Sequence, residues 1–116
     1  MNKYQQLDFQ LAKLLGLSCI GRLNGDTFIN RKQDSRVPCV IEEGTLFSPT
    51  SNNNHALSLM CEYELDIVWM GDKMFRVENS EGTFGTTTYI VDHDGCKETA
   101  MRFAVVECII SLLENN

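Results

Sequence analysis

The sequence predicts an α+β fold, with helices at both ends of the chain packed on antiparallel β-structure between them. Apolar residues recur at helical spacing over residues 3–15 and again over 96–114. The region between holds short β-prone runs separated by Asn-Gly and other glycine-containing turns, a pattern typical of antiparallel hairpins. We therefore expect an antiparallel β-sheet, a hairpin plus a three-stranded meander, packed with N-terminal, middle and C-terminal helices.

The first helix is expected over residues 3–15. One face of it would carry the apolar side chains of this segment, which are Tyr4, Leu7, Leu11, Leu14 and Leu15. Gly16 follows the last of them, at the place where a helix commonly ends in a left-handed residue.

A hairpin is expected next, because Asn24-Gly25 separates two β-prone runs. Its strands should lie near residues 17–23 and 26–31. A further short strand is expected over 37–41, where Pro38 would confine it to an edge or to a strand start.

The asparagine-rich stretch that follows Ser48-Pro49 is expected to begin a helix over about residues 53–63. The residue before a proline avoids helical geometry, which favours a turn at this point. Asparagine and serine side chains accept hydrogen bonds from the first free N–H groups of a helix. Ser51, Asn52 or Asn53 is therefore the expected N-cap.

The same stretch has a second interpretation, as a polar ligand site. The first N–H groups of a helix attract anions, and polar side chains gathered there would add contacts to a ligand. On this interpretation the binding residues are Asn52, Asn53, Asn54 and His55, joined in space by His93.

The three-stranded meander is expected between residues 67 and 92. Strands over 67–70 and 74–77 flank a Gly-Asp-Lys turn, and a glycine-rich turn at 79–85 precedes a strand over 86–92. The last helix should span about 96–114, with Asp94 or Gly95 as its cap. Apolar residues cover most of its circumference, so we expect it to be buried on several sides.

Length and composition favour one domain, residues 1–116, with 43% hydrophobic residues to form its core. No uninterrupted apolar run reaches the roughly 18 residues that span a bilayer. The leucines of the N-terminal segment are helically spaced rather than contiguous, unlike those of a signal peptide. These features predict a cytoplasmic protein. Because the last helix is apolar nearly all round, other helices or a second subunit should cover it, so a monomer or a homodimer is expected.

The formal charge of −6 argues against nucleic acid and anionic membranes as partners. Acidic residues gather at Glu42-Glu43 and again at Glu62, Glu64 and Asp66. Most of them are expected on a solvated face. Some could form an acidic surface that binds a basic protein groove, as charge complementarity would orient such a complex.

The five cysteines, Cys19, Cys39, Cys61, Cys96 and Cys108, show no Cys-x-x-Cys spacing. Zinc sites and disulfide frameworks prefer tight, repeated spacings. We predict five free thiols, no bound metal and no cofactor.

The densest group of reactive side chains lies at residues 92–96, with Asp92, His93, Asp94 and Cys96. Neighbouring residues on a loop point in different directions, and a closed metal site needs further ligands from elsewhere. The favoured interpretation is a strand-to-helix turn, and no catalytic residue is assigned. The alternative is a small-ligand site or a minor enzyme that uses the turns at 48–55 and 92–96.

Three segments of the chain, residues 3–17, 47–69 and 98–114, together resemble a known family. They are similar to the opening helix, to the middle turn, helix and strand, and to the closing helix of the NinX-like family of small phage proteins of unknown function. The family usually carries an Asp-Ala-Trp-Pro run where this chain has 55–58. It also has a proline near the start of its closing helix, and 98–102 have none.

The resemblance implies a phage or prophage accessory protein that acts in the bacterial cytoplasm, and it implies no catalysis. Together with the acidic charge, it predicts a non-enzymatic protein that binds a host or phage protein, for example to inhibit a host defence system.

Overall fold

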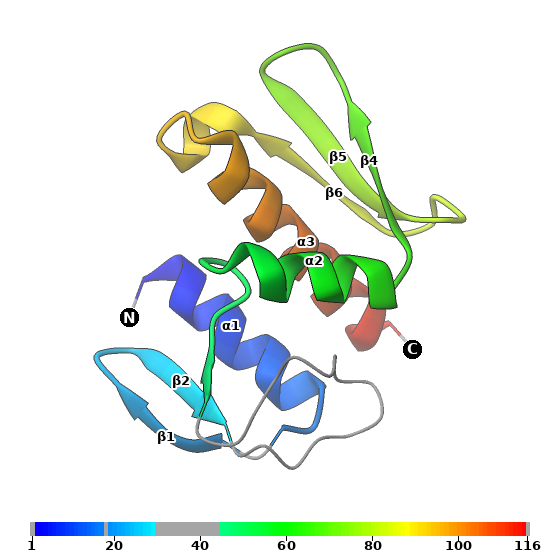
Figure 1. Cartoon of the computed structure of the whole chain (residues 1–116). Coiled ribbons are helices and arrows are strands. Elements are labelled where there is room, and N and C mark those ends of the chain that lie inside the picture. The colour runs from blue at the N-terminus through cyan, green and yellow to red at the C-terminus, as the bar shows by residue number, and fades with distance from the viewer. Residues whose placement is uncertain (1, 18, 30–44, 116) are drawn as a thin grey trace.

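The computed structural model of the chain describes residues 2–17, 19–29 and 45–115 (Figure 1). Its elements in chain order are α1 (Lys3–Leu14), β1 (Cys19–Leu23), β2 (Asp26–Ile29), β3 (Thr45–Phe47), α2 (Asn53–Glu62), β4 (Leu65–Trp69), β5 (Met74–Asn79), β6 (Gly85–Tyr89), the 3₁₀-helix η1 (Ile90–His93) and α3 (Lys97–Glu114). The predicted α+β class is confirmed. The predicted strand at 37–41 and the acids Glu42 and Glu43 lie outside the described residues.

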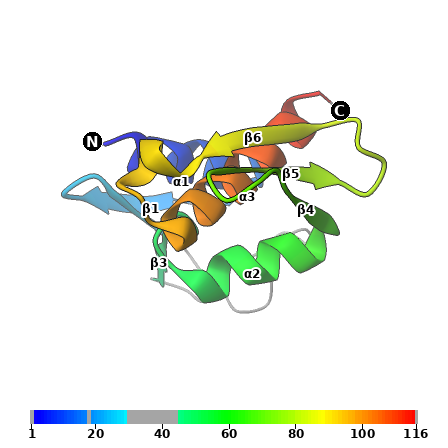
Figure 2. The same cartoon turned by 90° about the horizontal axis from the view of Figure 1, so that it is seen from above.

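Helix α3 is the centre of the fold. It lies between the β4–β5–β6 sheet and α1, and α1 in turn packs on β2 and β3 (Figure 1). Helix α2 packs beside α3 (Figure 2). The expectation that the last helix is buried on several sides is confirmed by its fully or nearly fully buried residues, which are Ala100, Ala104, Val105, Val106, Cys108, Ile109 and Ile110.

The ends of the first two helices follow the predicted chemistry. Gly16 has a φ of 77°, the left-handed conformation expected after α1. Of the three residues considered as the cap of α2, Asn52 is the one that serves: its side chain accepts a hydrogen bond from the backbone N–H of His55 at 3.1 Å. None of the described helices combines the length and the apolar character that crossing a membrane requires.

The predicted hairpin and the predicted meander form two separate sheets rather than one. Strands β1 and β2 are joined by the turn at Asn24 and Gly25, both with positive φ. Strand β3 adds to β2 in antiparallel pairing, with Phe47 opposite Thr27. Its three residues are too few to show an alternating pattern in the sequence.

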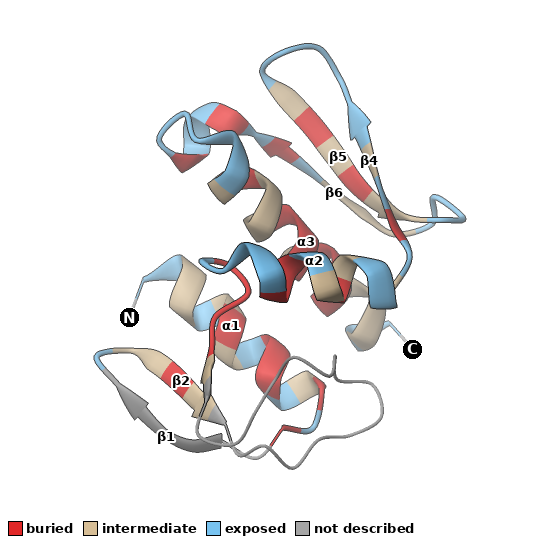
Figure 3. Ribbon diagram, viewed as in Figure 1, coloured by how far each residue is buried: buried red, intermediate tan, exposed pale blue. Residues whose placement is uncertain are grey.

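The second sheet has the order β4–β5–β6, and all its strands pair antiparallel. Phe75, Val77 and Thr88 are buried on the face that α3 covers. Phe75 and Val77 contribute to one contiguous core that also takes residues from all three helices and from β3 (Figure 3).

Two predictions near the last helix are wrong. Strand β6 ends at Tyr89 instead of continuing to residue 92, because Ile90–His93 turn into η1. Neither Asp94 nor Gly95 caps α3: both have positive φ, whereas the N-cap needs an extended backbone, which Cys96 has. Asp94 instead ends η1 in a left-handed conformation.

Candidate functional site

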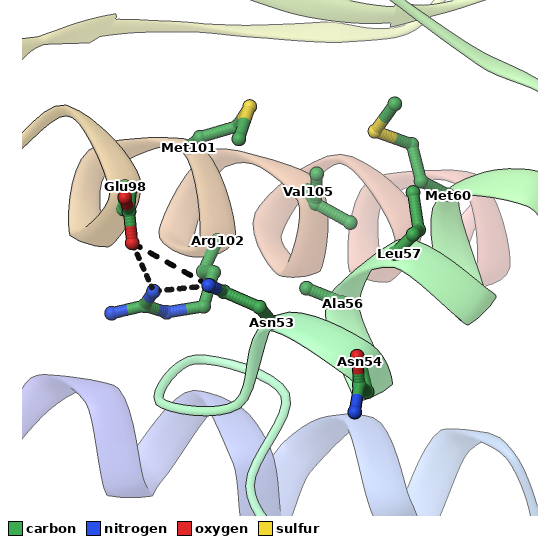
Figure 4. Close-up of a pocket in the computed structure, with 9 residues that line it drawn as sticks. All are labelled: Asn53, Asn54, Ala56, Leu57, Met60, Glu98, Met101, Arg102 and Val105. Carbon is green, nitrogen blue, oxygen red and sulfur yellow. Dashed lines mark hydrogen bonds and ion pairs between the residues drawn. The ribbon is translucent and has the colours of Figure 1, made fainter. Parts of the chain in front are cut away.

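A groove of about 330 Å³ lies between α2 and the N-terminal half of α3 (Figure 4). Most of its lining is apolar, and comes from Ala56, Leu57, Met60, Met101 and Val105. Its polar end is formed where the two helices begin, by Asn53, Asn54, Glu98 and Arg102. The groove therefore offers an apolar channel with polar groups at one end.

Arg102 ties the start of α2 to α3. Its Nε donates to the carbonyl oxygen of Thr50 at 2.9 Å, its Nη1 to Oδ1 of Asn53, and its Nη2 to Oγ1 of Thr99 at 3.2 Å. The side chain is only 14% exposed. Each of the three guanidinium nitrogens thus donates a hydrogen bond within the chain. These bonds fix the start of α2 against α3 and so fix the polar end of the groove.

Glu98 is the charged group that the groove presents to solvent. Its side chain is 69% exposed, and its Oε2 lies 3.9 Å from Nη1 of Arg102 and accepts from Nδ2 of Asn53 at 3.4 Å. Only Glu98 is exposed in this pair, and at this distance Arg102 neutralises its carboxylate little, because water screens the exposed charge. The outward charge at the polar end of the groove is therefore negative.

Leu57 forms the outer wall of the groove and is 57% exposed. Met60 and Met101 point toward the β-sheet side, and Ala56 and Val105 lie deeper between the helices (Figure 4). An exposed leucine is ordinary by itself. Here it borders an apolar channel, so the groove and its rim form one continuous apolar surface.

A buried carboxyl group, that of Asp8, supports the loop that leads into the groove. Asp8 is 4% exposed and accepts from the backbone N–H of Thr50 at 3.1 Å. Its Oδ2 lies 2.7 Å from Thr50 Oγ1, which also lies 3.4 Å from the carbonyl oxygen of Tyr4. Thr50 thus donates to both carboxyl oxygens of Asp8, from its backbone N–H to Oδ1 and from its hydroxyl to Oδ2.

Burial raises the pKa of Asp8 to about 7, against the lowering effect of the hydrogen bonds from Thr50. The charge of Asp26 raises it further. The carbonyl of Thr50 accepts from Arg102, so a continuous hydrogen-bonded chain runs from Asp8 to the polar end of the groove.

His55 lies beneath the asparagine-rich turn rather than in the groove. It is 8% exposed, and its ring stacks on Phe47 with the centroids 6.4 Å apart. Its Nδ1 has no hydrogen-bond partner among the described residues, and burial lowers its pKa. A neutral ring packed on an aromatic residue has a structural role here.

His93 lies at a different place, between α1 and α3. Its Nδ1 is 2.8 Å from the hydroxyl of Tyr4, and its ring packs on Phe103 with the centroids 4.4 Å apart. Burial, and after it the charge of Lys3, lowers the pKa of this histidine. His93 joins η1 to the start of α1.

The predicted binding residues are thus only partly brought together. Asn53 and Asn54 line the groove, while Asn52 caps α2 and points its side chain oxygen at the helix. Neither His55 nor His93 is among the lining residues. The acids Glu62, Glu64 and Asp66 are exposed, as expected of a solvated face.

The turn at 92–96 does not gather its reactive side chains. His93 is buried, while Asp92, Asp94 and Cys96 are exposed. Within the described ranges no three His, Cys, Asp or Glu side chains are placed to hold a metal ion. Cys61 and Cys96 are exposed free thiols, and Cys108 is buried.

Two features of the site were missed from the sequence. The groove depends on how α2 crosses α3, which no local pattern reports. Asp8 did leave a signal: it stands between Tyr4 and Leu11 on the apolar stripe of α1, at a position that the helix buries.

Comparisons with protein-family models, curated proteins and solved structures found no match. The kinship with the NinX-like family therefore remains a prediction from the sequence.

Proposed function

We propose that this chain is a binding protein that holds a segment of another protein in the α2–α3 groove. The observation that carries the proposal is the groove itself, an apolar channel bordered by a half-exposed leucine and ending in an exposed carboxylate. Helix-in-groove recognition uses apolar anchors laid into such a channel.

The occupant that the groove favours is an amphipathic helix with lysine or arginine at one end. Apolar side chains spaced along one face would contact Leu57, Met60 and Met101. A basic residue at the end of the segment would meet Glu98, whose carboxylate faces outward while Arg102 is satisfied within the chain. Exposed Glu62, at the other end of α2, adds negative charge there.

The partner is proposed to be a host or phage protein in the bacterial cytoplasm, and one role of such binding would be to inhibit a host defence system. The sequence resemblance supports the phage origin, and the formal charge of −6 supports a basic protein surface rather than nucleic acid as partner. The alternative of a small-ligand site has less support, because Asn53, His55 and His93 pack in different surroundings.

Affinity capture from infected or prophage-carrying cells tests the proposal. The bait is compared with Leu57→Asp, which places a charge on the groove wall, and with Val91→Asp, a matched control. Val91 is a 78% exposed apolar residue of η1 that does not line the groove. We expect a partner that Val91→Asp retains and Leu57→Asp loses.

Salt dependence gives a second test on the same bait. Capture should weaken as salt rises, and also with Glu98→Gln, because both reduce attraction between the carboxylate and a basic segment. Glu81→Gln, in the turn between β5 and β6, serves as the control for an exposed acid elsewhere. A partner that Leu57→Asp retains would contradict the proposal, and so would a shift of duplex DNA by the purified protein at physiological salt.

A further inference from the structure

Strand β4 forms an edge of the second sheet, and nothing within the described residues pairs with its outer side. Its backbone groups can be assigned from the register. The N–H of Met70 donates to the carbonyl of Met74, and Val68 stands opposite Arg76. Hydrogen-bonded pairs alternate along an antiparallel ladder. Leu65, Ile67 and Trp69 therefore direct their N–H and C=O groups away from β5.

Apart from Asp66, this edge is apolar and lacks the usual protection. Edge strands are commonly blunted by lysine, proline or a bulge. Strand β4 reads Leu-Asp-Ile-Val-Trp and pairs with β5 in regular register. Val68, Trp69 and the following Met70 are 41%, 52% and 46% exposed. The other edge, β6, is instead rich in threonine.

We propose that the β4 edge pairs with the β4 edge of a second copy of this chain, in antiparallel register about a two-fold axis at Val68. The two sheets would then form one six-stranded sheet. A strand is the occupant because only an extended backbone satisfies a row of alternating free N–H and C=O groups.

The strand is self-complementary in this register. Val68 would face the second copy's Val68 on the outer side of the sheet, and Ile67 would face its Trp69 on the inner side. Both are cross-strand pairs of the kind that stabilise sheets. Trp69 keeps Phe75 of its own chain at 5.1 Å and Lys97 Nζ at 6.0 Å from its ring.

The one charged residue of β4, Asp66, would stand opposite the second copy's Met70. The two Asp66 carboxylates would be four residues apart, or about 14 Å at ~3.4 Å per residue, beyond the ~8 Å over which physiological salt screens charge. In this register the exposed Asp72 of the hairpin tip would stand opposite the second copy's exposed Glu64, with the exposed Lys73 next to it. A five-residue edge is small, so we expect a weak, concentration-dependent dimer.

Sedimentation velocity over a concentration series tests the proposal. We expect the wild-type chain to pass from monomer to dimer as concentration rises, and more readily at higher salt, which screens the repulsion between two chains of charge −6. Ile67→Pro removes a backbone N–H that would bond the second copy, and it removes no hydrogen bond to β5. It should therefore abolish the dimer. Thr87→Pro is the matched control on the other edge of the sheet, β6, because the backbone N–H of Thr87 also faces away from β5. This variant should dimerise as wild type does.

Circular dichroism establishes that each variant is folded, and Val68→Lys provides the same test if Ile67→Pro does not fold. A chain that stays monomeric at its highest soluble concentration would overturn the proposal. So would a dimer that survives Ile67→Pro and Val68→Lys, or one that only Thr87→Pro removes.

Discussion

A buried carboxyl group, that of Asp8, sets part of the pH dependence of stability. Its pKa in the folded chain is about 7, above the 3.8 of an ordinary Asp, so the folded state binds the proton more tightly than the unfolded state. The contribution of Asp8 to stability is therefore fully present at pH below about 3.8 and is lost as pH rises toward about 7.

Replacing Asp8 with asparagine should remove this pH dependence. The amide oxygen can accept from the Thr50 N–H, and the amide NH₂ can donate to Thr50 Oγ1, whose own hydrogen can turn to the carbonyl of Tyr4. We expect Asp8→Asn to be more stable than wild type at pH 8, by on the order of a few kcal/mol, and close to it at pH 4. Urea unfolding at the two pH values measures the difference, and an equal effect at both would contradict a raised pKa.

The cap of α2 gives a second prediction at a single residue. Asn52→Ala removes the hydrogen bond to the N–H of His55 and should cost about 1 kcal/mol of unfolding free energy. Asn54→Ala, two positions into the helix, should cost much less, since it removes no cap. Denaturant unfolding of the two variants decides the point, and the larger loss at Asn54 would show that the cap is misassigned.

Most of the helices and strands could be predicted from the sequence. Helix α1 and both hairpins have strong local signals, namely a glycine after an apolar stripe and turn residues between β-prone runs. The start of α3 was misjudged because Asp94 and Gly95 are good cap residues by type, and whether they cap depends on φ.

Only the polar end of the α2–α3 groove could be predicted from the sequence. Asn53 and Asn54 are polar residues at a predicted helix start, so the sequence marks them as binding candidates. The groove is also lined by Met101 and Val105, which come from a helix far along the chain. The two histidines attracted a functional interpretation because histidine often serves in sites. Their burial against Phe47 and Phe103 is a tertiary property that composition does not report.

The contact between η1 and α1 makes a prediction for these two elements. Tyr4→Phe removes the hydroxyl that bonds Nδ1 of His93 at 2.8 Å and leaves a buried nitrogen unpaired. The expected loss is about 1–3 kcal/mol of unfolding free energy. Thermal unfolding of Tyr4→Phe beside Tyr89→Phe, a half-exposed tyrosine of β6, measures it. Equal melting temperatures would contradict the structural role of this bond.

The reactivity of the thiols shows which cysteines the folded chain buries. Cys96 is exposed, and hydrogen bonding from Thr99 lowers its pKa, whereas burial raises the pKa of Cys108 to about 11. Thiolate is the reactive form, so alkylation of the native protein should modify Cys96 early and Cys108 only after unfolding. Mass spectrometry of the peptides separates the two sites. Early modification of Cys108 would contradict the burial of α3.

Titration of the thiols tests whether all the cysteines of the chain are reduced. Denatured under non-reducing conditions, the protein should release five titratable thiols, one for each cysteine. Elemental analysis should show no stoichiometric zinc, and one zinc per chain would contradict the cysteine prediction.

We propose that a partner protein occupies the α2–α3 groove, and the methionines allow a direct test. Met60 and Met101 line the groove, whereas Met70 and Met74 lie at the β4–β5 hairpin. The measurement is the NMR spectrum of the chain labelled with ¹³C at its methionine methyl groups, at constant chain concentration, as captured partner is added. We predict that the Met60 and Met101 signals shift while those of Met70 and Met74 stay in place. Shifts confined to Met70 and Met74 would contradict the claim.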